Sequence, residues 1–172
     1  MDQLFKNAWE EIINAYNRSL INSERTLQAH LYAHLASNLS SSVIICEPTI
    51  ELQQGNQVIP DMLVLDLNAN EVIAAVELKF VPHHYPKCKE DLNKLLAYSD
   101  SKDCFQLLLE PSTGRFTDTK FTFSPKCLMV FGVIGHKDAE AIHKETLDNE
   151  MATIKNRFLL LPHSVGNKDN LV

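Results

Sequence analysis

The chain has 172 residues, of which 45% are hydrophobic and 22% are charged, and its formal net charge is −6. This length suits one domain with one core, and the composition excludes collagen-like, disordered and low-complexity proteins. A nucleic-acid-binding protein with this acidic total must concentrate its lysines locally, because phosphate attracts positive charge. We expect a single domain over residues 1–172, with N-terminal helices in 1–39, a core in 40–135, a C-terminal helix and strand in 136–162, and a polar tail in 163–172.

Secretion and membrane insertion are not indicated. Residues 1–10 lack an apolar signal core, and the longest apolar run, 128–134, is too short to cross a bilayer. The four cysteines form no CxxC pair, which a zinc site normally requires. We therefore expect a cytoplasmic protein with reduced thiols and no membrane partner.

Two helices are predicted at the N-terminus. Apolar residues recur at helical spacing over residues 2–18 and predict an amphipathic helix, whose apolar face packs either on the core or on a second subunit. A second helix is expected after a cap at Asn22 or Ser23 and runs to about Asn38, where a run of serines follows.

Three segments rich in β-branched residues come next and predict strands over residues 43–53, 57–66 and 71–80. The first is interrupted by Pro48. The third is apolar on both faces, so we expect it at the centre of the sheet, covered on both sides.

The rest of the chain predicts further elements: a helix over about 87–99, a strand or helix end at 105–109, a turn-rich segment at 110–125, a buried strand at 127–134, a helix at 138–150 and a short strand at 157–161. The order of helices, three strands, helix, strand and helix indicates an α/β fold. Its central mixed β-sheet would carry helices on its faces.

Two carboxylates fall on the second and third predicted strands. If residues 68–70 form the connecting turn, the resulting register places Asp61 opposite Glu77. Lys79 lies two residues beyond Glu77 and so shares its face. Because two carboxylates side by side on a covered sheet repel each other, we expect a divalent cation between them, with Lys79 adding positive charge.

Glu24 leads an apolar stripe on the second predicted helix, followed at helical spacing by Leu27, Leu31 and Leu35. A charge on that face needs a partner, which a metal site against the sheet would supply. The alternative is an exposed first-turn glutamate that interacts favourably with the helix dipole. Both interpretations stay open.

The segment PD at 60–61 and the segment ELK at 77–79, which follows an apolar run, resemble the signature of the PD-(D/E)xK, or restriction-endonuclease-like, nuclease superfamily. The helix that carries Glu24 and the helix after the motif are similar to the α-β-β-β-α-β core of that superfamily. The resemblance spans about residues 20–135. It implies a metal-dependent phosphodiesterase that acts on nucleic acid, with DNA as the favoured substrate.

The resemblance also implies roles for individual residues. Asp61 and Glu77 would hold Mg²⁺ or Mn²⁺ together with the Leu78 carbonyl, and Glu24 would reach the cation directly or through water. The cation would activate a water molecule and stabilise charge on the scissile phosphate. Lys79 would orient the attacking water or balance the charge of the transition state. A homodimer would suit such an enzyme, because small nucleases of this type often cut two strands as dimers.

Basic residues after the motif are candidates for substrate contact. Lys89 and Lys94, together with Lys87, would form a local phosphate-binding patch, whereas a solvated helix face is the alternative for Lys87 and Lys89. Tyr98 lies one helical turn after Lys94. Some exonuclease-like members carry Gln and Tyr at this spacing. In this chain Lys94 stands in the position of that Gln. Further candidates lie in the connecting segments: His83, His84, Arg115 and Lys120.

The sequence was also compatible with two other classes of site. His30 and His34 are one helical turn apart and could bind zinc, but the Glu of a zinc-protease motif is missing between them. No phosphate-cradling Gly-rich loop is present, so an ATP or dinucleotide site is not expected.

Two rival functions remain open. The first is a catalytically inactive nuclease-fold module for binding or assembly, which the acidic charge favours. The second is an unrelated α/β interaction protein, in which Asp61 and Glu77 lie far apart.

Overall fold

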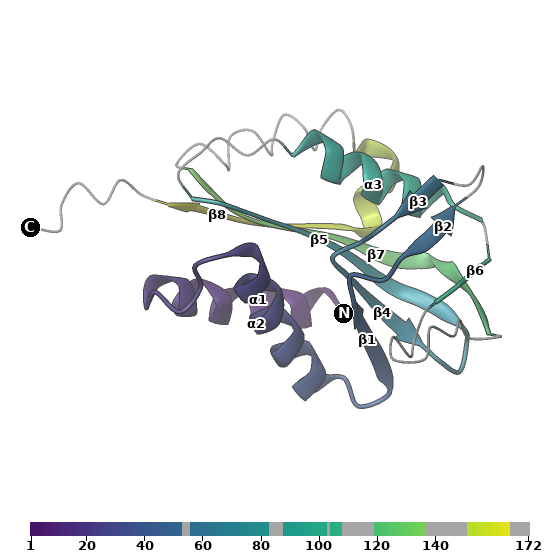
Figure 1. Cartoon of the computed structure of the whole chain (residues 1–172), viewed down its shortest axis with the longest axis horizontal. Helices are drawn as coiled ribbons and strands as arrows, with labels where there is room; N and C mark the ends of the chain where they lie inside the picture. The colour runs from purple at the N-terminus through teal and green to yellow at the C-terminus, as the bar shows by residue number, and fades with distance from the viewer. Residues whose placement is uncertain (53–55, 83–87, 103, 108–118, 137–150, 166–172) are drawn as a thin grey trace, which may run out of the picture.

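Two helical layers enclose a six-stranded mixed β-sheet (Figure 1). This computed structural model describes residues 1–52, 56–82, 88–102, 104–107, 119–136 and 151–165. The strand order is β1 (Ser42–Cys46), β4 (Met62–Asp66), β5 (Glu71–Val81), β7 (Lys120–His136) and β6 (Phe105–Gln106), and β8 (Phe158–Val165) also pairs with β7. Helices α1 (Asp2–Asn17) and α2 (Glu24–Asn38) cover one face, and α3 (Lys89–Asp100) covers the other. The predicted α/β class, with a mixed open sheet flanked by helices, is confirmed.

Helix α1 packs on the core through the apolar stripe that its sequence predicts. Phe5, Ala8 and Trp9 are buried in the same cluster as Leu78 of β5. Of the two predicted packing partners, the core of the same chain is therefore the one that this stripe contacts. The Trp9 ring lies over Gly132 of β7, where a Cβ atom would come within 2.8 Å of the ring.

Ser23 caps α2 and fixes the place where this helix meets the sheet. The backbone N–H of Thr26 donates to the Ser23 hydroxyl at 3.2 Å, and the Ser23 N–H donates to the Thr26 hydroxyl at 3.0 Å. This reciprocal pair is a capping box, and such a cap contributes about 1 kcal/mol to helix stability. Because the leucine stripe of α2 is buried, Glu24 at the start of that stripe lies beside the sheet.

Two of the predicted strands are each divided into two. The segment 43–53 forms β1 and β2 (Ile50–Leu52), and the segment 57–66 forms β3 (Asn56–Val58) and β4. Strands β2 and β3 pair with each other as a separate two-stranded sheet. The first segment is divided around Pro48, where an interruption was predicted, whereas the prediction of one continuous strand over 57–66 is wrong.

Backbone chemistry explains both divisions. Glu47 has a left-handed φ of 50° and precedes Pro48, and Pro60 likewise has no N–H for a strand ladder. The Glu47 N–H instead donates to the carbonyl of Asp61 at 3.0 Å. Asp61 consequently lies immediately before β4, at the point where the small sheet leaves the large one.

A β-bulge on β5 restores the predicted register of the β4–β5 hairpin. The turn after β4 is one residue longer than expected, so Asp66 pairs with Glu71. Ile73 is the extra residue of the bulge and shifts the ladder by one, so Met62 pairs with Val76. The longer turn and the bulge cancel, and the register beside the site is the one that the sequence predicts. Strand β5 lies between β4 and β7 and is largely buried, as expected for a central strand.

The C-terminal strands are longer than predicted. Strand β7 begins at Lys120, so Phe121 and Phe123, which were expected in a turn-rich segment, are buried strand residues. Strand β8 continues to Val165, into the expected polar tail. The helix expected at 138–150 lies outside the described residues.

Two of the four cysteines are exposed and two are buried. Cys46 and Cys104 are exposed, Cys88 and Cys127 are buried, and all four are thiols. Burial raises the pKa of Cys88 to about 11 and that of Cys127 to about 12, which makes both poor nucleophiles at neutral pH. In the described part of the chain, no helix is long and apolar enough to cross a membrane.

Candidate functional site

Asp61 occupies the junction between α2, β4 and β5. Its Oδ2 accepts a hydrogen bond of 2.5 Å from the backbone N–H of Leu78. Its carbonyl oxygen accepts from Nε2 of Gln28 at 2.7 Å and from the N–H of Glu47 at 3.0 Å. Strand β5 extends past the start of β4, so the Leu78 N–H lies beyond the β4–β5 ladder. It donates to the Asp61 carboxylate, where a longer β4 would have offered a backbone carbonyl.

Glu24 reaches the same edge of β5 from the first turn of α2. Its Oε2 accepts a hydrogen bond of 3.2 Å from the backbone N–H of Phe80. Glu24 is exposed to solvent, yet it also contacts the sheet two residues along from the Leu78 N–H. Glu24 is therefore an exposed residue of the first helical turn, as one interpretation expected, and it also contacts the sheet, as the other required.

Glu77 is buried on the face of β5 that α3 covers. Its side chain is 1% exposed. Oε2 lies 3.0 Å from Nζ of Lys94, and Oε1 accepts a hydrogen bond of 2.9 Å from the hydroxyl of Tyr98. Burial and then the charge of Asp61 raise the pKa of Glu77 to about 7, against the two contacts from α3, which favour the charged form.

Lys79 pairs with an acid that sequence reasoning missed. Its Nζ lies 3.1 Å from Oδ2 of Asp91, in the first turn of α3. Oδ1 of the same carboxylate lies 3.5 Å from Nζ of Lys94. Burial lowers the pKa of Lys79, but the contact with Asp91 and the negative charges of Glu24 and Asp61 together make the net shift upward.

The carboxylates around Glu77 outnumber the ammonium groups that face them. Burial is the largest cause that raises the pKa of Asp61, to about 6, and the negative charge of Glu24 adds to it. Three carboxylates, on Asp61, Glu77 and Asp91, face the ammonium groups of Lys79 and Lys94. An additional cation would favour the ionised form of the acids.

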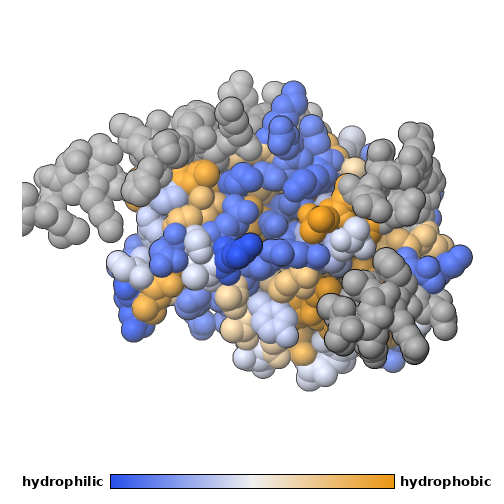
Figure 2. Space-filling model, in the orientation of Figure 1, coloured by the Kyte–Doolittle hydropathy of each residue, from blue (hydrophilic) through white to orange (hydrophobic). Residues whose placement is uncertain are grey.

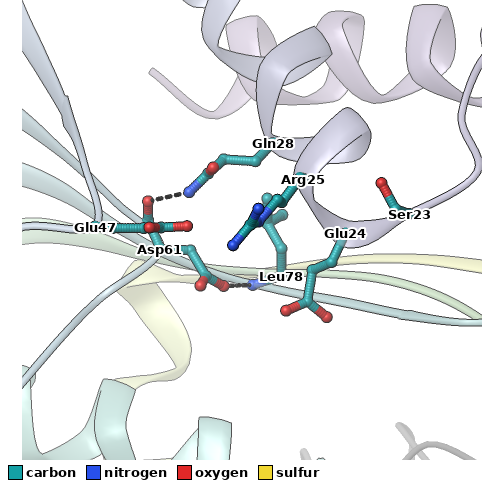
Figure 3. A pocket seen from close by; sticks show the side chains of 7 residues that line it. All are labelled: Ser23, Glu24, Arg25, Gln28, Glu47, Asp61 and Leu78. Atoms are coloured by element: carbon teal, nitrogen blue, oxygen red, sulfur yellow. Dashed lines mark hydrogen bonds between the residues drawn. The ribbon is translucent and has the colours of Figure 1, made fainter.

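An open pocket of about 350 Å³ lies between the start of α2 and the edge of β5 (Figure 3). Its lining consists of Ser23, Glu24, Arg25, Gln28, Glu47, Asp61 and Leu78. Figure 3 shows the carboxylates of Glu24 and Asp61 on either side of the Leu78 backbone, with the Arg25 guanidinium nearby. The space-filling view shows hydrophilic residues gathered over the face between the α1–α2 layer and α3 (Figure 2).

The donor chemistry of this junction fits a hard divalent cation. Carboxylate oxygens from Asp61 and Glu77, and the backbone carbonyl of Leu78, are the ligand types that Mg²⁺ and Mn²⁺ prefer. Within the described residues, no three His, Cys, Asp or Glu side chains are grouped as a complete metal site. A cation would therefore also need the carbonyl oxygen or water to complete its coordination.

The structure brings together some of the predicted substrate-binding residues. Lys94 and Tyr98 converge on Glu77, so both line the candidate site. Lys89 is exposed at the first position of α3. Lys120 pairs with Gln106 where β7 meets β6, away from the β4–β5 junction. Four candidates lie outside the described residues: His83, His84, Lys87 and Arg115.

His34 of α2 contacts an acid on helix α1. Nδ1 of His34 lies 2.8 Å from Oε2 of Glu11, which links α2 to α1. His30 is partly buried. These contacts place His34 in helix packing.

Sequence reasoning also missed the parts that Gln28, Glu47 and Asp91 play in the site. Asp91 had a usable signal, because Asp91, Lys94 and Tyr98 are three and then four residues apart and so share one face of a helix. Gln28 interrupts the leucine stripe of α2, where an apolar residue would be expected. Glu47 carried no comparable signal, because its position depends on a positive φ.

Comparisons of the chain with protein-family models, curated proteins and solved structures gave no match.

Proposed function

We propose that the chain is a divalent-metal-dependent nuclease of the PD-(D/E)xK type, which hydrolyses phosphodiester bonds of nucleic acid, with DNA as the favoured substrate. The observation that carries the proposal is the placement of Asp61 near the buried Glu77, with Lys79 two residues further along β5. The order α2, β1, β4, β5, α3, β7 supports a restriction-endonuclease-like core. The small hairpin of β2 and β3 is inserted into that order.

The acids of the site would bind the cation, and Lys79 would contact the substrate. Asp61, Glu77 and the Leu78 carbonyl would hold Mg²⁺ or Mn²⁺, with Glu24 at the outer edge. When bound, the cation supplies Lewis-acid chemistry, which activates water and stabilises charge on the scissile phosphate. The Lys79 side chain is 27% exposed, so its ammonium can contact the phosphate or the attacking water while Asp91 holds it.

Helix α3 supplies the residues next to the substrate path. The Lys94 side chain is 37% exposed, so its ammonium can contact a phosphate group as well as Glu77. Tyr98 is buried and orients the Glu77 carboxylate through its hydroxyl. Lys89, exposed five residues before Lys94, would add a second positive group on the same helix. This local arrangement offsets the net charge of −6, which is unfavourable for binding nucleic acid.

A second candidate function is a nuclease-fold module that binds or assembles without cleaving. The observation that favours it is the engagement of both Glu77 oxygens by Lys94 and Tyr98, together with the hydrogen bond between Asp61 and the Leu78 N–H. In such a module, these contacts would be structural and would leave the acids unable to hold a cation.

A cleavage screen distinguishes the two functions. The protein is incubated with Mn²⁺ and a panel of single-stranded, double-stranded and branched DNA and RNA, and products are resolved by electrophoresis. The variants are Lys79→Ala and, as a matched control, Lys126→Ala, which removes an exposed lysine of β7. We expect cleavage by the unsubstituted protein and by Lys126→Ala, and a loss of at least about 100-fold in Lys79→Ala. Equal cleavage by all three proteins would refute the assignment of this site, and no cleavage of any substrate would favour the binding module.

A further inference from the structure

Helix α3 turns a charged face toward the sheet. Asp91, Lys94 and Tyr98 share this face, and Asp91 is only 6% exposed although it carries a carboxylate. Burying a charge is costly unless it is paired, so a buried Asp in the first turn of a helix needs a specific partner. The partners are lysines from two different elements.

Each oxygen of the Asp91 carboxylate faces one ammonium group. Oδ2 lies 3.1 Å from Nζ of Lys79, and Oδ1 lies 3.5 Å from Nζ of Lys94. Lys94 also contacts Glu77 at 3.0 Å, so it is shared between two acids. Lys79, which protrudes from the same face of β5 as Glu77, is paired with Asp91.

This arrangement matters because the Lys79 ammonium would have other acids within its reach if Asp91 were absent. Its side chain is long and starts two residues from Glu77, so without Asp91 its ammonium could turn toward the carboxylates of Asp61 and Glu77. An ammonium in that position would neutralise the acids and compete with a divalent cation for them.

We propose that Asp91 is a positioning residue, which holds the Lys79 ammonium away from Asp61 and Glu77 and so keeps these two acids available to a divalent cation. The inference rests on the proposed function, since Asp61 and Glu77 are its cation ligands. It adds a residue that acts through Lys79 and does not itself bind the cation.

The test is a double-mutant cycle on Mn²⁺ affinity, which requires no cleavage activity. Mn²⁺ dissociation constants are measured by titration calorimetry for the unsubstituted protein, Asp91→Asn, Lys79→Ala and the double variant. Asn is close to Asp in size but cannot hold an ammonium by charge. We expect Asp91→Asn to weaken Mn²⁺ binding by about tenfold or more, which corresponds to about 1.4 kcal/mol. In the Lys79→Ala background the same substitution should change the constant by less than about twofold, because the Lys79 ammonium is absent and the Lys94 ammonium already contacts Glu77.

Two controls keep the outcome interpretable. Thermal unfolding of all four proteins shows whether each one folds, and Asp91→Glu, which retains the charge, should bind Mn²⁺ more tightly than Asp91→Asn. An equal weakening in both backgrounds would overturn the proposal, because it would show that Asp91 acts only as a nearby negative charge. Unchanged affinity in Asp91→Asn would overturn it as well. Failure of the unsubstituted protein to bind Mn²⁺ would instead refute the proposed function itself, and the positioning role with it.

Discussion

The ammonium of Lys94 on helix α3 lies 3.0 Å from Oε2 of Glu77 on strand β5. Glu77 is 1% exposed, so this contact provides positive charge to an acid that is almost entirely removed from water. Helix α3 is therefore part of the candidate site as well as a cover for the sheet. Any substitution that moves α3 will also change the environment of Glu77.

The hydroxyl of Tyr98 is the second contact between α3 and Glu77, and its removal provides a test of this link. In Tyr98→Phe, Oε1 of Glu77 loses the hydrogen bond of 2.9 Å. We expect the free energy of unfolding to fall by about 1.5–3 kcal/mol, the range for hydrogen bonds to a charged group. Chemical denaturation measures the change. Tyr32→Phe is the matched control, because Tyr32 is an exposed tyrosine of α2, and it should lose less than about 0.5 kcal/mol.

Asp61 and Glu77 predict an unusual dependence of stability on pH in the metal-free protein. Their folded-state pKa values, about 6 and about 7, lie above the ordinary values of 3.8 and 4.5. An acid whose pKa is raised by folding binds its proton more tightly in the folded state. Its contribution to stability is therefore complete below about pH 4 and is lost as the pH rises toward the folded-state pKa.

Asp61→Asn separates the contribution of Asp61 from that of Glu77. Asn has no proton to lose in this range, and its side-chain oxygen can still accept from the Leu78 N–H. We expect the fall in unfolding free energy between pH 4.5 and pH 8 to be smaller in Asp61→Asn than in the unsubstituted protein, as measured by urea denaturation. Identical pH profiles for the two proteins would contradict the raised pKa of Asp61.

Gly132 of β7 is required for the close approach of helix α1. A Cβ atom at this position would lie 2.8 Å from the Trp9 ring and 2.9 Å from Cδ2 of Leu78. We expect Gly132→Ala to destabilise the protein by about 1–3 kcal/mol, the usual cost of overpacking. Combining it with Trp9→Leu should cost less than the sum of the two single substitutions, because the smaller side chain removes the clash with the Trp9 ring. Additive losses would show that the packing of Trp9 does not limit the residue at this position.

Much of the scaffold of the site could be predicted from the sequence because its signals are local. The apolar spacing of α1 and the Ser23 cap of α2 appear where they were expected. The convergence of Lys94 and Tyr98 on Glu77 follows from their spacing on one helical face.

The parts that were not predicted depend on backbone irregularities and on distant contacts. The predicted β4–β5 register beside Asp61 is correct only because the bulge at Ile73 compensates for a longer turn. No residue pattern in the sequence indicates this bulge. The positive φ of Glu47 and the division of two strands arise where the chain leaves the main sheet. Asp91 was overlooked because a charged residue in the first turn of a helix is most often solvated, and its partner Lys79 comes from another element.

Titration calorimetry with Mn²⁺ at pH 7.5 tests the central claim most directly, namely that Asp61 and Glu77 hold a divalent cation. The unsubstituted protein is compared with Asp61→Asn, and with Asp66→Asn, an exchange of the same kind at the turn after β4, as a control. We predict one saturable site in the unsubstituted protein and in Asp66→Asn, and at least about tenfold weaker binding in Asp61→Asn, a difference of about 1.4 kcal/mol. No binding by the unsubstituted protein, or equal binding by all three, would contradict it.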